Sequence, residues 1–306
     1  MTPSVVVLGS ANLDLVVRQP RRAVPGETIF GSGFTTGPGG KGLNQAVACA
    51  RAGAAVSFVG AVGRDDFGVR LRATMADEGI DASLVVTADE PTGVAAITVT
   101  DDAENSIVVV PGANSHATLS AAERARIAEA SFLVVQLERP VALVAEAMTC
   151  ARAAGATTVL TPAPITEGVD DLLPLADILI PNEGEALALT GADDAETAAC
   201  LLSRPAGTVI VTRGERGCLV ARGGHVIRRV AAIPAAAADT TAAGDTFAGV
   251  VVAFLAEGAD LDLALDAATA AAAIAVTRPG AVASMPARHE IAAAVAARRP
   301  AGTRTS

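Results

Sequence analysis

A short segment near the C-terminal end, Asp239–Asp245, places a carboxylate directly after three small residues, Ala242, Ala243 and Gly244. Small side chains let a backbone turn approach a ligand closely, and an apolar helix is expected to begin at this turn. Its first N–H groups and positive dipole end would form an anion hole for a transferring phosphoryl group. Asp245 would then accept the proton of an attacking hydroxyl. The alternative role for this carboxylate is a helix cap.

The glycine-rich segment Gly37–Ala46 is the second candidate site. Its glycines free the backbone to wrap a polar ligand, and Lys41 and Asn44 offer hydrogen-bond donors. Lys41 is the only lysine of the chain, and a compact ammonium fits a crowded loop better than a wide guanidinium. The segment is not a Walker phosphate loop, because Thr35 and Gly42 stand where that motif needs Gly and Ser or Thr. The alternative is a tight turn that precedes a helix.

Polar residues also follow the first apolar run, in Gly9–Asp14. Asn12 and Asp14 are two apart on an extended chain, so they face the same side. Together they suit sugar hydroxyls, which both donate and accept, although a plain turn is the simpler interpretation. Ala11 and Asp14 break the dinucleotide-binding fingerprint, which excludes a nicotinamide dehydrogenase.

The elements that would position these motifs alternate along the chain. Apolar runs predict buried strands at Val5–Leu8, Val56–Val59, Phe132–Gln136, Thr158–Leu160, Ile178–Ile180 and Val209–Val211. Helices are expected at Leu43–Ala52, Phe67–Glu78, Val141–Ala154, Glu183–Leu189, Ala243–Glu257 and Leu261–Val276. This alternation predicts an α/β fold with a mostly parallel sheet that is covered on both faces.

Four further strand-like pieces do not fit the alternation: Leu13–Arg18, Glu27–Thr36, Thr92–Thr100 and Ser106–Val110. They predict a small second sheet that projects from the main one and acts as a lid. We therefore expect one domain over residues 1–306, with a discontinuous β lid formed by residues 13–36 and 92–110. A lone small sheet exposes an apolar face, which favours a homodimer through the lid.

Composition narrows the classes of function. The 306 residues are 51% hydrophobic and carry a net charge of −10, which argues against a nucleic-acid partner but not against ATP, whose phosphates backbone N–H groups can hold. No apolar run approaches the length of a membrane span, and the N-terminus shows no signal-peptide pattern. A cytoplasmic protein without a membrane partner is expected.

The motifs at Asp239–Asp245 and Gly37–Ala46 resemble the two signatures of the ribokinase family of carbohydrate and nucleoside kinases. Weaker matches at residues 111–114, 136–138, 182–185, 212–217 and 271–280 extend the resemblance to nearly the whole chain. It implies a three-layer α/β sandwich with a central, mostly parallel sheet and a small β-sheet lid. It also implies ATP-dependent phosphorylation of D-ribose at the 5-hydroxyl, with Mg²⁺ and an activating K⁺.

The resemblance assigns roles to individual residues. Asp245 would be the catalytic base, beside the anion hole of Ala242, Ala243 and Gly244. The sugar would be bound, together with Asp245, by Asn12, Asp14, Gly40, Lys41, Asn44 and Glu138. ATP would contact Asn182, Thr212, Gly214, Gly217, Gly244 and Thr269. Glu185 would organise Mg²⁺ through water. The monovalent cation would be surrounded by Asp239, Thr241, Ala275, Arg278, Gly280 and Ser284.

Two alternatives remain open at this point. The first is a kinase of the same family that acts on fructose, 2-deoxyribose, pseudouridine or adenosine. Glu138 and the scarcity of aromatic residues favour ribose, because a nucleoside base would prefer a ring to stack on. The second is a sugar sensor on the same fold without catalytic activity.

Overall fold

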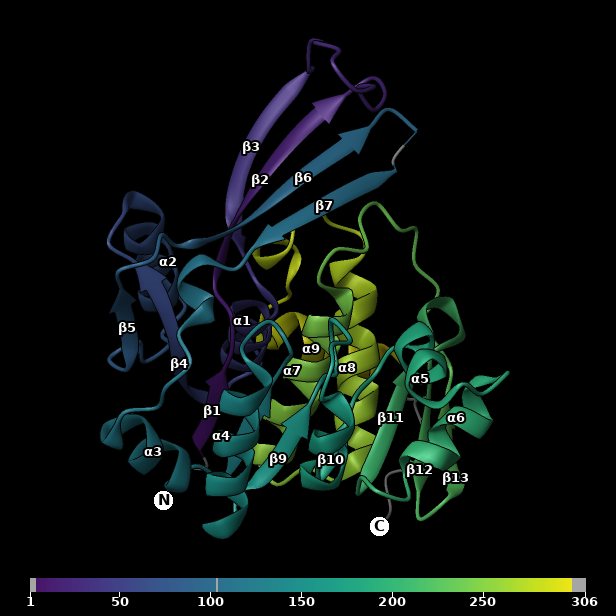
Figure 1. Ribbon diagram of the computed structural model, residues 1–306. Helices are drawn as coiled ribbons and strands as arrows, with labels where there is room; N and C mark the ends of the chain where they lie inside the picture. The colour runs from purple at the N-terminus through teal and green to yellow at the C-terminus, as the bar shows by residue number, and fades with distance from the viewer. Residues whose placement is uncertain (1–3, 103, 299–306) are drawn as a thin grey trace.

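The computed structural model describes residues 4–102 and 104–298, and their largest element is a nine-stranded sheet (Figure 1). Its strand order is β13-β12-β11-β10-β9-β8-β1-β4-β5. The strands are β1 (Ser4–Leu8), β4 (Ala55–Gly63), β5 (Val85–Ala88), β8 (Phe132–Val135), β9 (Thr157–Leu160), β10 (Ile178–Leu179), β11 (Thr208–Thr212), β12 (Cys218–Arg222) and β13 (His225–Val230). All neighbours pair in parallel except β11–β12 and β12–β13.

Helices cover both faces of this sheet. One layer contains α1 (Lys41–Arg51), α2 (Asp66–Asp77), α7 (Ala243–Ala256), α8 (Leu261–Ala275) and α9 (Arg288–Arg298). The opposite layer contains α3 (Ala121–Ala128), α4 (Val141–Ala153), α5 (Glu183–Thr190) and α6 (Ala195–Leu202). The predicted three-layer α/β fold is confirmed. In the described ranges, no helix has the length and hydrophobicity needed to span a membrane.

The first strand shows why its sequence is apolar throughout. Val5 and Val7 point into the core under α1 and α7, whereas Val6 and Leu8 point into the core under α4. Successive side chains of a strand alternate between faces, so a strand buried on both sides needs no polar positions. β1 lies between β8 and β4, third from the β5 edge of the sheet, and the loop after it follows the carboxyl end of this interior strand.

The small sheet projects from the main body with the order β3-β2-β6-β7 (Figure 1). Its strands are β2 (Asn12–Gln19), β3 (Gly33–Gly39), β6 (Gly93–Thr100) and β7 (Asn105–Val110). The predicted strand Glu27–Thr36 is wrong in its first half, since β3 begins at Gly33 and continues through Pro38. β3 is an edge strand, where a proline without an N–H is tolerated.

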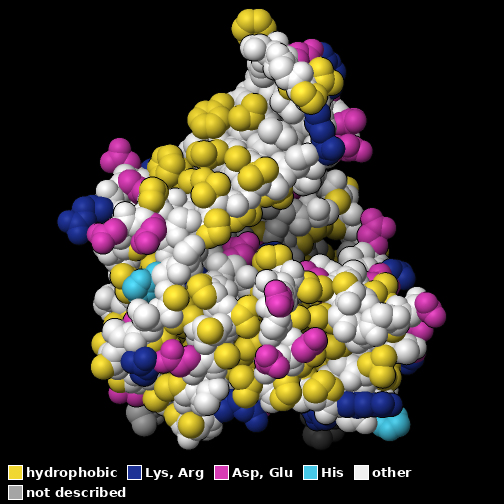
Figure 2. Space-filling model, viewed as in Figure 1, with side chains coloured by type: hydrophobic (Ala, Val, Ile, Leu, Met, Phe, Trp, Pro, Cys, Tyr) yellow, Lys and Arg dark blue, Asp and Glu magenta, His cyan; other side chains and the backbone are white. Residues whose placement is uncertain are grey.

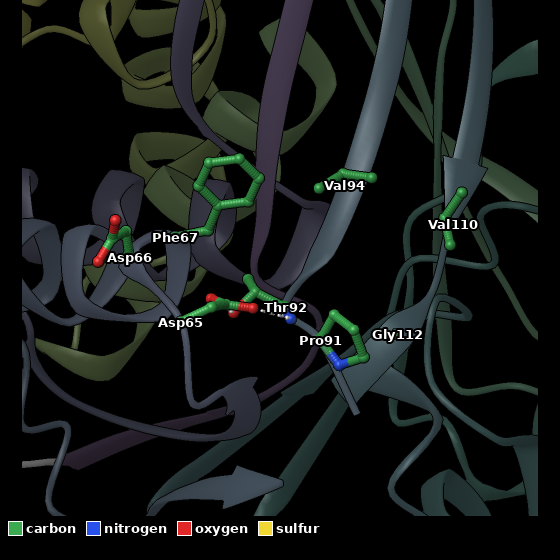
Figure 3. A pocket seen from close by; sticks show the side chains of 8 residues that line it. All are labelled: Asp65, Asp66, Phe67, Pro91, Thr92, Val94, Val110 and Gly112. Carbon is green, nitrogen blue, oxygen red and sulfur yellow. Dashed lines mark hydrogen bonds between the residues drawn. The ribbon is translucent and has the colours of Figure 1, made fainter. Parts of the chain in front are cut away.

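The base of the small sheet is tied to the body by one carboxylate. Asp65 accepts hydrogen bonds from the backbone N and the hydroxyl of Thr92, at 2.8 and 2.6 Å, and it also caps α2 through Gly68 N. Figure 3 shows Asp65 and Thr92 facing one another beside a cavity of about 400 Å³. The start of β6 is therefore fixed to α2 while its far end projects outward.

Candidate active site

Three chain segments meet at the carboxyl end of β1: the loop after it, the start of α1 and the start of α7. Helices α1 and α7 pack against each other, so residues 200 positions apart become neighbours. The close approach of the segment before α1 to the segment after β1 depends on glycine, because a Cβ on Gly39 would lie 2.3 Å from the Asp14 carboxylate. Gly40 has a φ of 90° and would place a Cβ 2.9 Å from Asn12 N. The motifs at Gly9–Asp14 and Gly37–Ala46 thus form a single wall.

Asp245 stands in the first turn of α7 and faces α1. Its Oδ2 accepts a hydrogen bond from Asn44 Nδ2 at 3.0 Å, and its Oδ1 accepts one from Gln45 Nε2 at 2.9 Å. Burial raises the pKa of Asp245, and the charge of Lys41 and the two amide donors offset part of that rise. The carboxylate does not cap its own helix, so the capping alternative is not what the structure shows.

The start of α7 has no side-chain cap. Ala242 adopts a φ of 57°, the only positive φ at a non-glycine position in the described residues. A left-handed alanine is strained, and here it turns the chain so that the helix begins without any side-chain cap. Unpaired N–H groups at such an end attract a phosphate. Gly244 and Ala243 border the adjacent cavity.

Two carboxylates predicted to bind the sugar, Asp14 and Glu138, lie close enough for their charges to interact. Burial, with a contribution from the charge of Glu138, raises the pKa of Asp14 to about 7. Glu138 accepts hydrogen bonds from the Ser10 hydroxyl and from Lys41 N, the latter at 3.0 Å. One oxygen of Glu138 therefore fixes the β1 loop to the start of α1. Hydroxyl groups of a sugar would find acceptors here.

Asn114 is a site residue whose role the sequence did not indicate. It follows β7, is 1% exposed, and donates from Nδ2 to Asn12 Oδ1 at 2.8 Å. Its Oδ1 accepts a hydrogen bond from Ala11 N at 3.0 Å. The Asn12 amide is therefore oriented with its Nδ2 available as a donor. Asn114 lies in the segment 111–114 that was noted for its resemblance only.

A cavity of about 530 Å³ opens on the other side of the α7 start. Five of the six residues predicted to contact ATP line it: Thr212, Gly214, Gly217, Gly244 and Thr269. Its remaining wall is largely apolar and comes from residues 232–237, Phe247 and the last turns of α8. Sequence reasoning missed this wall, because alanine and valine positions carry no chemical signal. The cavity suits a planar apolar group joined to phosphates.

Comparison with known proteins identifies the family. The model of the pfkB family carbohydrate kinases matches residues 2–288. This chain belongs to that family. It is 42% identical to the ribokinase of Haemophilus influenzae, over 95% of this chain and 97% of that protein. It is 38% identical to the ribokinase of Staphylococcus aureus, over 95% and 99%.

Solved structures support the assignment of this chain to the carbohydrate kinase family. Arabidopsis thaliana ribokinase complexed with ribose and ATP superposes with a TM-score of 0.90, at 32% identity, over 96% of this chain and 99% of that one. Ribokinase from Thermotoga maritima gives a TM-score of 0.89, also at 32% identity, over 97% and 100%. The expected family and fold are therefore confirmed over nearly the full length.

Glu185, the residue predicted to organise Mg²⁺, stands in the first turn of α5, close enough to Asp245 for their charges to interact. Asn182 caps α5 and pairs with Thr212, while Glu185 accepts a hydrogen bond from Asn182 N at 2.8 Å. Burial raises the pKa of Glu185, and the charge of Asp245 adds to that rise, whereas Asn182 N–H and Lys41 oppose it. The described residues contain no cluster of three or more potential metal-ligating side chains. One or two carboxylates fit Mg²⁺ that arrives with nucleotide phosphates.

Two of the segments predicted to surround a monovalent cation, at residues 239–241 and at Gly280, contact each other next to the start of α7. Asp239 accepts hydrogen bonds from Thr241 N at 2.9 Å and from Gly280 N at 2.8 Å. Arg278 N bonds to Ala275 O at 3.0 Å, and the Arg278 side chain turns away to Glu290. Ser284 is buried and donates to Ala281 O at 2.8 Å.

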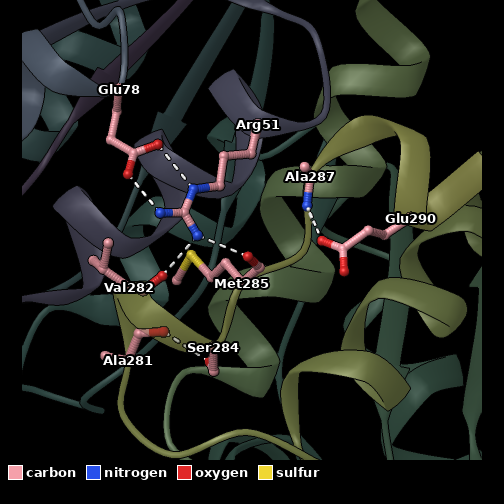
Figure 4. Close-up of polar contacts among 8 residues, drawn as sticks. All are labelled: Arg51, Glu78, Ala281, Val282, Ser284, Met285, Ala287 and Glu290. Atoms are coloured by element: carbon pink, nitrogen blue, oxygen red, sulfur yellow. Dashed lines mark hydrogen bonds and ion pairs between the residues drawn. The ribbon is translucent and has the colours of Figure 1, made fainter.

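A guanidinium group holds the chain around Ser284 in place. Arg51, at the end of α1, donates to the carbonyls of Val282 and Met285 at 2.9 and 2.7 Å and pairs with Glu78 (Figure 4). The segment at Ser284 is thereby fixed to the same helix that carries Lys41 and Asn44.

Proposed function

We propose that this kinase transfers the γ-phosphoryl group of ATP to the 5-hydroxyl of D-ribose. The observation that carries the proposal is the position of Asp245, between the polar side chains at the start of α1 on one side and the uncapped start of α7 with its adjoining cavity on the other. Asp245 takes the hydroxyl proton as the oxygen bonds to phosphorus and the bond to ADP breaks. The N–H groups at the start of α7 stabilise the transferring group.

The remaining residues bind and orient the substrates. Asn12, Asp14, Asn44 and Glu138 would engage the sugar hydroxyls, and the ammonium of Lys41 would offset the phosphate charge. Mg²⁺ that arrives with ATP would supply further charge neutralisation, and Glu185 would help to hold it through water. The small sheet, as a lid over one domain comprising residues 1–306, would exclude water and suppress hydrolysis of ATP.

A comparison of substrates tests the choice of sugar. D-ribose is expected to give the highest kcat/KM among ribose, 2-deoxyribose, fructose and adenosine in an assay of ADP release. The polar cluster around Asp14 offers donors and acceptors for sugar hydroxyls, and the absence of Trp and Tyr removes the best stacking platform for a nucleoside base. A tenfold advantage for fructose or adenosine would leave the family assignment but reject ribose. A protein that releases no ADP with any sugar would be a sensor.

A bound monovalent cation is proposed at the turn formed by Asp239, Thr241 and Gly280. Backbone carbonyls of this turn would hold the ion, which would order the start of α7 without contacting the substrates. K⁺ is therefore expected to raise kcat over Na⁺ at equal ionic strength. Equal rates in the two salts would remove the cation from the mechanism.

We also propose that two copies associate through the small sheet. Phe34, Val108 and Val110 lie on its face opposite Asp14 and are 65%, 64% and 52% exposed. Figure 2 shows hydrophobic side chains gathered over this part of the molecule, and exposed apolar patches of this kind mark interaction surfaces.

Sedimentation measurements test the association. Wild-type protein is expected to sediment as a dimer and Val108→Asp as a monomer, because a charge on the contact face would have to be buried. The control is Ile227→Asp. Ile227 is also a β-branched apolar residue, is 52% exposed, and lies on β13 at the opposite edge of the main sheet, far from the small sheet. A monomeric wild-type protein at micromolar concentration would reject the proposal.

A further inference from the structure

A chain of buried side-chain amides leads from the central sheet to Asp245. Gln136 directly follows β8, and its Nε2 donates to Gln45 Oε1 at 2.7 Å. Gln45 lies in α1 and donates from Nε2 both to Asp245 Oδ1 and to Thr161 Oγ1, each at 2.9 Å. Gln45 and Gln136 are 1% and 0% exposed. Both amides therefore stand behind the carboxylate, out of contact with solvent.

The direction of this chain follows from the chemistry of its end. An ionised carboxylate only accepts hydrogen bonds, so Gln45 must present its Nε2 to Asp245. Its oxygen then points to the donor on Gln136, and both of its amide protons are used. A flip of the Gln45 amide would place its oxygen against the Asp245 carboxylate and its NH₂ group against that of Gln136, so the bonds to both residues would be lost. One orientation is therefore strongly preferred.

Gln136 is retained at a site where its own oxygen has no partner. Gln136 Oε1 is buried and makes no hydrogen bond in the described residues. A buried unsatisfied polar atom is unfavourable, so an apolar side chain of similar size would suit packing better. The donor at Nε2 explains why glutamine stands here. Gly9 leaves the room for it, because a Cβ at that position would lie 2.2 Å from Gln136 Oε1.

The surroundings of Asp245 otherwise contain charges of both signs. Lys41, from α1, favours the ionised form, and Glu138, from the segment after β8, opposes it. Glu185, from α5, is close enough for the two carboxylates to affect each other. Asn44 supplies the second neutral donor, but it also belongs to the proposed sugar pocket. Gln45 is the donor that is separate from the proposed substrate contacts.

We propose that Gln45 and Gln136 are positioning residues that keep Asp245 ionised and aimed at the substrate hydroxyl. Gln45 acts directly on the carboxylate, and Gln136 acts only through Gln45. This inference rests on the proposed role of Asp245 as the base. It assigns a catalytic consequence to two side chains that touch neither sugar nor nucleotide.

The test is the pH dependence of kcat at saturating ribose and ATP, which reports the base in the ternary complex and excludes effects on sugar binding. Gln45→Met removes the donor at nearly constant volume. The acidic limb of the pH profile of kcat is expected to move to higher pH by about one unit. A shift of this size corresponds to the loss of one hydrogen bond to a charged group. Gln136→Met is expected to shift the limb in the same direction by a smaller amount.

The double variant tests whether the two residues act in series. Gln45→Met with Gln136→Met should match Gln45→Met alone, because Gln136 has no other route to Asp245. The control is Cys49→Ala, a buried substitution further along α1, which should lower the thermal midpoint and leave the acidic limb in place. If Gln45→Met does not fold, Gln136→Met still tests the proposal.

An unchanged acidic limb in the folded variants would overturn the inference, as would an effect of Gln136→Met that persists in the absence of Gln45. Failure of the underlying assignment is seen separately in Asp245→Asn. If that variant is nearly inactive while the glutamine variants keep the wild-type pH profile, Asp245 remains the base and only the positioning role is lost.

Discussion

Replacing Asp245 with Asn is expected to lower kcat by about 10²–10⁴-fold, the usual contribution of general-base catalysis. The substitution keeps the shape of the side chain and removes the charge that accepts a proton. The structure also explains why the variant should fold. Asn44 Oδ1 has no hydrogen-bond partner among the described residues, so the Asn44 amide can rotate and accept from the new amide group at position 245.

The measurements are kcat from ADP release and the thermal midpoint from calorimetry. Sugar affinity is expected to weaken, because the carboxylate also binds the hydroxyl that it activates, while ATP affinity is kept. The matched control is Asp262→Asn, a first-turn carboxylate of α8 whose contact is a surface ion pair with Arg228. Turnover above about a tenth of the wild-type rate would reject Asp245 as the base and direct attention to Glu138 or Asp14.

The KM for ribose is expected to rise as the pH falls below about 7, because Asp14 is proposed to bind sugar hydroxyls as an ionised carboxylate. Its pKa is raised to about 7, chiefly by burial. If only the ionised form binds, KM increases about tenfold for each pH unit below that value. Asp14→Asn should raise KM about 10- to 100-fold, the loss of a charged hydrogen bond, and remove the pH dependence.

The effect of Asp14 on stability should have the opposite pH dependence to its effect on ribose binding. A raised pKa means that the folded state favours the protonated form. The stability from Asp14 is therefore full below its ordinary pKa and is lost as the pH rises to about 7. Asp14→Asn avoids the burial of a charge and should raise the thermal midpoint of the free protein at pH 8. A KM that stays constant between pH 5.5 and 8, or a variant with a lower midpoint at pH 8, would contradict this account.

The sequence alone was enough to predict the elements with a strong local signal. Val5–Leu8, Val141–Ala154 and Ala243–Glu257 were predicted within one or two residues, because apolar periodicity reflects the core directly. β12 and β13 were not predicted. Exposed histidine and arginine positions interrupt the apolar pattern of β13, whereas β12 is a short apolar run that is buried at four of its five positions. The extent of β3 was also misjudged, since Gly37 and Pro38 indicate a loop unless the strand is known to lie at an edge.

The same division applies to the site. The order of residues in Asp239–Asp245 was enough to indicate an anion hole with a carboxylate, because a helix start and its first turn are local features. The hydrogen bonds that hold that carboxylate join Asp245 to residues 200 and 201 positions away. Only the packing of α7 on α1 brings them together. Burial of Asp14 and its pKa of about 7 likewise depend on neighbours from several segments, because desolvation and charge coupling are set by distances in space that the order of residues does not contain.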